Sequence, residues 1–201
     1  MNRYIAIIAF AFTLVSCQRD RFFEDEDDPG LSRLTSYSYD VCSAYVAGRP
    51  WVRPFFNVLR GEARVHLQLR PDAGIYDTLD IEFPGRFETE PLPGSVPWQS
   101  ATTMTFAVPV AKGFTGEKFL AMAGQQFPAP NTQVLVSLHG EPGQGVVTGS
   151  GRLYLISIRR SQAAGQEFVC TGLFDGNIGD SILVTKGRFD YRIREDDHNL
   201  Q

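Results

Sequence analysis

Histidine and cysteine are scarce in this chain, which has three residues of each. His66, His139 and His198 lie in different segments, and no two of them have the close spacing that is typical of metal-binding motifs. The nucleophile motif Gly-Xaa-Ser-Xaa-Gly is also absent from the sequence. We therefore expect no catalytic residue, no metal site and no cofactor, and we expect a protein that is not an enzyme.

A long hydrophobic run is missing as well. The apolar stretch 5–15 is too short for a membrane-spanning helix, which needs about 20 apolar residues. It follows Arg3, as in a signal peptide. It ends at Leu14-Val15-Ser16-Cys17, which resembles the lipobox of bacterial lipoproteins. The resemblance implies that 1–16 is a lipoprotein signal peptide and that acyl chains on Cys17 hold the protein in the membrane. The alternative is an ordinary secretory signal with an incidental cysteine.

Positive charge is not in excess, because the formal net charge is −4. Nucleic acid is therefore not an expected partner. Residues 24–28 are five consecutive acids, and their mutual repulsion predicts that 17–36 is a flexible, solvated tether after the lipidated Cys17. An acidic run close to a lipidated cysteine resembles the surface-export signals of Bacteroidota lipoproteins. The predicted location is the outer membrane, lipid-anchored and exposed at the cell surface, and the alternative is that the run is a plain spacer.

Two cysteines remain if Cys17 is acylated. An even pair in an exported chain is typical of a disulfide, so we expect Cys42 and Cys170 to be bonded. The alternative is a pair of buried free thiols.

Alternation of apolar and polar residues dominates the rest of the chain. Val65, Leu67 and Leu69 alternate with polar residues, which indicates a half-buried antiparallel strand. A short helix is expected only at 117–123. Gly and Pro separate the alternating segments, so we predict an all-β domain over 37–194, followed by a frayed tail at 195–201. The expected architecture is an antiparallel β-sandwich or a partly closed barrel with at most one short helix. Further strands are expected at 39–46, 51–59, 75–83, 102–110, 134–138, 153–155, 168–174, 182–184 and 189–193.

Both ends of this domain resemble a family of uncharacterised Bacteroidota lipoproteins. Residues 42–54 are similar to the family's opening strand, turn and Trp-Pro segment, with Ala47-Gly48 where Asn-Gly is commoner. Residues 168–174 and 184–190 are similar to its closing hairpin, which ends in Gly-Xaa-Phe. The resemblance implies a β-rich lipoprotein domain and supplies no catalytic residue.

Aromatic residues supply the candidate binding surface. Trp98 follows a proline-rich loop and is the ring we expect to be exposed for ligand binding, whereas Trp51 is expected in the core. Asp80 and Glu82 share one face of a strand; they could form a hydrolytic or calcium site, but we favour an ordinary solvent-facing pair. The expected function is a non-catalytic surface lipoprotein that binds a ligand, such as a glycan, or a protein partner. The alternatives are a structural or assembly subunit of an envelope complex and, third, a glycan-active hydrolase.

Overall fold

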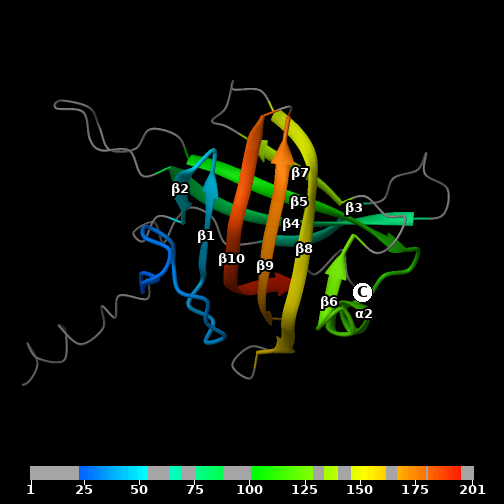
Figure 1. Cartoon of the computed structure of the whole chain (residues 1–201). Coiled ribbons are helices and arrows are strands. Elements are labelled where there is room, and N and C mark those ends of the chain that lie inside the picture. Colours follow the sequence, from blue (N-terminus) through cyan, green and yellow to red (C-terminus); the bar gives the residue numbers. More distant parts are fainter. Residues whose placement is uncertain are drawn as a thin grey trace, which may run out of the picture.

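A computed structural model gives the structure of the chain (Figure 1). Cys17, Trp98 and His198 lie outside the part of the chain that it describes. The described residues are 23–53, 64–68, 76–87, 101–128, 134–139, 146–161, 167–179 and 181–195.

The described chain is almost entirely β-structure, which confirms the predicted all-β class with one short helix. Helix α2 (Gly116–Leu120) is capped by Thr115, whose Oγ1 accepts a hydrogen bond from the Lys118 amide. None of the helices in the described residues is long and apolar enough to cross a membrane. The strands are β1 (Val41–Val46), β2 (Arg49–Val52), β3 (Arg64–Gln68), β4 (Tyr76–Phe87), β5 (Ala101–Ala111), β6 (Gln125–Phe127), β7 (Val134–His139), β8 (Val146–Arg160), β9 (Glu167–Ile178) and β10 (Ile182–Glu195).

All ten strands belong to one sheet, which curls back on itself. The main path runs β1-β2-β4-β3-β10-β9-β8-β7-β5, and β5 also pairs with β4 while β1 also pairs with β10. Strands β8, β9 and β10 lie side by side, and β4 and β5 cross behind them (Figure 1). The named pairs are antiparallel except β10–β3, which is parallel. The architecture is therefore a nearly closed barrel rather than a sandwich of two sheets.

The core fills the inside of this barrel, where every second strand residue points. On β4, Leu79, Ile81 and Phe83 are fully buried, as their alternation predicts. The Phe83 ring lies 4.6 Å from that of Phe189 and 5.7 Å from that of Tyr191, measured between centroids. Aromatic packing across β4 and β10 therefore joins opposite walls of the barrel.

Trp51 lies in the core, as predicted. Its side chain is fully buried, and Nε1 donates a hydrogen bond of 2.6 Å to Thr102 Oγ1. The indole occupies the space above Gly85, where a Cβ atom would lie 2.2 Å from Trp51 Cζ2. Glycine at position 85 is therefore what lets the indole approach the backbone of β4.

The turn between β1 and β2 consists of Ala47 and Gly48. Both have positive φ values, 51° and 75°, as the central residues of a type I′ turn require. Alanine is strained in this left-handed conformation because its Cβ approaches the following carbonyl.

The predicted disulfide between Cys42 and Cys170 is wrong. Both thiols are free and buried. Cys42 lies on β1 opposite Phe189, and Cys170 lies on β9 opposite Tyr191, so strand β10 runs between them. Two strand spacings, together with the two-residue offset between Phe189 and Tyr191, separate the cysteine Cα atoms by more than about 10 Å, beyond the roughly 7 Å that a disulfide can span.

Candidate functional site: an outer groove beside a docked strap

Residues 23–40, which we call the strap, are folded against the barrel. A bridge between Glu24 and Ser32 closes the strap on itself. Leu31 is fully buried, and Asp28 is 8% exposed. Ser32 is tied to β1, because its amide donates to Ser43 Oγ at 2.9 Å. The expectation that this acidic segment is a solvated tether with few contacts is therefore wrong for the described residues.

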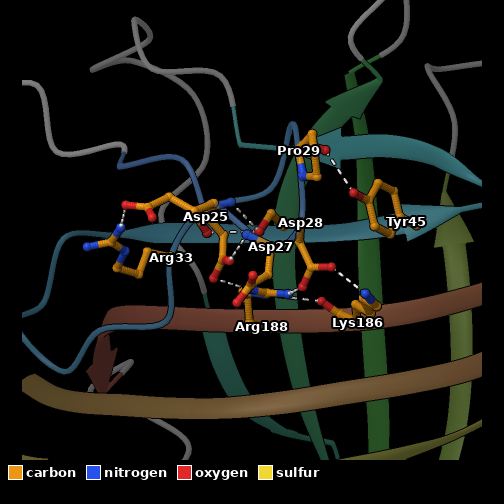
Figure 2. A network of polar contacts seen from close by, with 11 residues as sticks. Asp25, Asp27, Asp28, Pro29, Arg33, Tyr45, Lys186 and Arg188 are labelled. Carbon is orange, nitrogen blue, oxygen red and sulfur yellow. Dashed lines mark hydrogen bonds and ion pairs between the residues drawn. The ribbon is translucent and has the colours of Figure 1, made fainter.

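Two acids of the strap pair with two cations of β10 (Figure 2). Arg188 Nη1 donates to Asp25 Oδ2 at 2.7 Å, and Arg188 Nη2 donates to Asp28 Oδ2. Lys186 Nζ donates to Asp28 Oδ1. The hydrogen bonds from Lys186 and Arg188 hold the pKa of Asp28 below its usual value. This pairing offsets the repulsion within the acidic run, which explains why the run is ordered here.

Asp190 forms the second attachment of the strap. Its carboxylate is fully buried and accepts hydrogen bonds from Thr35 Oγ1 at 2.5 Å, from the Tyr37 amide at 2.9 Å and from the Ser38 amide at 3.0 Å. A buried carboxylate needs such donors because it has lost its hydration. The strap is therefore attached to β10 at two places along the strand.

A groove of about 500 Å³ opens on the outer face of β8, β9 and β10, where Asp28 of the strap contributes to its wall. Tyr154 on β8 lies opposite Leu173 on β9, and Arg152 lies opposite Asp175. Residues directly opposite on neighbouring strands share a face of the sheet, so these four side chains line the groove together.

The groove combines apolar surface with fixed charges. Tyr154 is 39% exposed and Leu173 is 38% exposed. Arg152 Nε and Nη2 donate to the two carboxylate oxygens of Asp175, both at 2.9 Å, in a bidentate pair. The hydrogen bond to Asp175 raises the pKa of the Arg152 guanidinium, so this group keeps its charge. Lys186 adds an amino group whose side chain is 57% exposed.

Chemistry of another kind is not evident in the described part of the chain. There, no three His, Cys, Asp or Glu side chains gather as a metal site. Asp80 is only 8% exposed, so the expectation that it faces solvent is wrong, while Glu82 is partly exposed. Burial raises the pKa of the Cys42 and Cys170 thiols, and the charge of Asp190 adds to this effect at Cys170. These thiols are therefore protonated and enclosed rather than poised to react.

The groove is not among the sites predicted from the sequence, although part of its pattern is visible there. Arg152 and Tyr154 alternate with buried Leu153 and Leu155, which places them on the outer face of β8. The missing information is the register, because only the pairing of β8 with β9 brings Leu173 and Asp175 beside them. Trp98, the predicted binding residue, lies outside the described residues and stays a prediction.

The chain has no significant match to any protein-family model, curated protein or solved structure. Its function is therefore inferred from the geometry of the groove and from the features of the sequence.

Proposed function

We propose that this protein is a non-catalytic lipoprotein of the outer membrane surface that binds a carbohydrate chain in the groove on β8, β9 and β10. Acyl chains on Cys17 provide the anchor, and the groove provides the recognition. The observation that supports the binding role is the open groove of about 500 Å³ in which Tyr154 lies beside the Arg152–Asp175 pair.

Carbohydrates have apolar C–H faces and hydroxyl edges, and both kinds of surface have partners here. The exposed Tyr154 ring and Leu173 offer apolar contact to a sugar face. Arg152 and Asp175 hold each other in a fixed orientation, so a hydroxyl meets a prearranged donor and acceptor. An open groove also accommodates a chain that continues at both ends, which a closed cavity does not.

The binding role can be tested with a panel of hexaoses (glucan, xylan and mannan types) and soluble peptidoglycan fragments, titrated calorimetrically against the acylated protein in detergent. We expect at least one probe to bind, and Tyr154→Ala to weaken that binding about tenfold, which corresponds to about 1.4 kcal/mol. Arg152→Lys should also weaken it, because lysine cannot form the bidentate pair. The matched control is Tyr37→Ala, which removes an exposed tyrosine outside the groove.

Binding that is unchanged in Tyr154→Ala would place the ligand elsewhere, for example at Trp98. The absence of binding to every probe would favour the alternative, a subunit of an envelope complex. A specific observation supports that alternative: Val146, Val147 and Leu183 are 54%, 39% and 56% exposed. These side chains lie near the starts of β8 and β10, and a partner that covered them would remove apolar surface from water.

The anchor has a separate test. Cys17→Ala should release the protein from the membrane fraction and abolish incorporation of labelled palmitate. A variant that stays in the membrane fraction would show that acylation of Cys17 is not the anchor. Protease treatment of intact cells then measures whether the anchored protein faces outward.

A further inference from the structure

The strap displays a group of aromatic and apolar side chains, which we call the aromatic patch: the exposed Phe23, Leu34 and Tyr37 and the partly exposed Tyr39. Phe23 is 50% exposed, Leu34 is 37% exposed and Tyr37 is 71% exposed. The Tyr39 ring joins them, because its centroid lies 5.7 Å from that of Phe23 and 5.6 Å from that of Tyr37. The rings of Phe23, Tyr39 and Tyr37 therefore form a continuous surface rather than scattered apolar residues.

The patch lies at the place where the chain comes from Cys17. Only six peptide units separate Cys17 from Phe23, and a fully extended chain of that length spans about 20 Å at most. A free tether over 17–36 would reach about 65 Å by the same measure. Since the strap is docked from Phe23 onward, the acyl chains must enter the membrane within about 20 Å of the patch.

The chemistry of the patch suits the boundary between lipid and water. Tyrosine rings combine an apolar body with a polar hydroxyl, and they are enriched where membrane proteins meet the headgroup layer. Charge repulsion from the neighbouring acids is also reduced, because Asp25 and Asp28 are paired with Arg188 and Lys186.

We propose that the aromatic patch rests on the bilayer to which Cys17 is attached and so fixes the orientation of the barrel. The proposal assumes the acylation of Cys17 that is part of the proposed function. Thr148 then points away from the membrane. Ser157 on β8 pairs with Thr171 on β9, and Thr171 pairs with Asp190 on β10, so Ser157 is level with the attachment of the strap. Thr148 lies nine residues from Ser157 along β8, which places it about 30 Å from that attachment.

Single-site labelling tests this orientation in the full acylated protein. Cys42 and Cys170 are buried, so a cysteine introduced at the surface is the only accessible thiol among the described residues. Ser36→Cys places a bimane fluorophore beside the patch, and Thr148→Cys is the control, because both positions are exposed. The protein is reconstituted in phosphatidylethanolamine–phosphatidylglycerol vesicles that contain lipids with a headgroup nitroxide, which quenches nearby fluorophores.

The label at position 36 should lose most of its emission, and the label at position 148 should keep it. Replacing Phe23 and Tyr37 with serine in the Ser36→Cys protein should restore the emission, because the short chain alone no longer holds the patch on the lipid. Equal quenching at the two positions would overturn the proposal. Quenching at position 36 that survives the serine substitutions would also overturn it, since the patch would then not be the contact.

Failure of the anchor gives a different result. A protein that carries no acyl group will not float with the vesicles, which rejects the anchoring as well as the orientation. A protein that floats but is quenched equally at both positions rejects only the orientation.

Discussion

Asp190→Asn is the sharpest test of how the strap is held. The carboxylate of Asp190 is fully buried and accepts hydrogen bonds from Thr35 Oγ1, the Tyr37 amide and the Ser38 amide. Asparagine keeps one acceptor oxygen and places an NH₂ group against the remaining donors. Hydrogen bonds to a charged group contribute about 1.5–3 kcal/mol each, so the loss of two should weaken docking of the strap by about 3–6 kcal/mol.

Hydrogen exchange measures this loss where it occurs. A weakening of about 3 kcal/mol should accelerate exchange of the Tyr37 and Ser38 amides about 100-fold, provided that they exchange by local opening of the strap. The control is Asp175→Asn, which breaks an ion pair with Arg152 whose side chains are 42% and 62% exposed, and it should leave these amides unchanged. Equal exchange rates in Asp190→Asn and Asp175→Asn would refute the argument that Asp190 holds the strap.

Three further predictions concern other parts of the molecule. Cys42 and Cys170 are free but buried, so both should resist thiol reagents in the native protein and both should react after denaturation without reductant. Failure to label them in the denatured protein would indicate a bond between them. Docking of the strap, measured by limited proteolysis, should be constant from pH 7 to pH 5 and weaken below about pH 4. The pKa of Asp28 is lowered because its ionised carboxylate pairs with Lys186 and Arg188, and this pairing stabilises the docked strap only while the carboxyl is ionised. A strap that is released already at pH 6 would contradict this assignment. Ala47→Asn should raise the free energy of unfolding in urea by about 0.5–1 kcal/mol, because asparagine tolerates the positive φ of this turn better than alanine, and a decrease would argue against the type I′ turn.

Local periodicity predicted most of the fold, because a strand that faces a core on one side must alternate. It located β4, β5 and β9 to within a few residues, and it placed Trp51 in the core. It wrongly divided β10 into two strands, at 182–184 and 189–193, because the segment between them is a bulge within one continuous strand and not a turn. It did not predict β6, which has only three residues and pairs only with β8. It also could not decide between a sandwich and a barrel, because closure depends on pairings such as β10–β3 between segments far apart in the chain.

The two errors with consequences for function have the same physical origin. The disulfide was inferred from an even cysteine count, which contains no information about the strand that lies between Cys42 and Cys170. The free tether was inferred from repulsion within 24–28, but the compensating cation Arg188 lies 160 residues from Asp28. Folding brings these charges together, and Asp28 then also contributes to the wall of the groove. The shape of the candidate binding site therefore depends on docking of the strap. Neither the docking nor the shape of the groove can be predicted from the acidic run alone, because both depend on residues far away in the sequence.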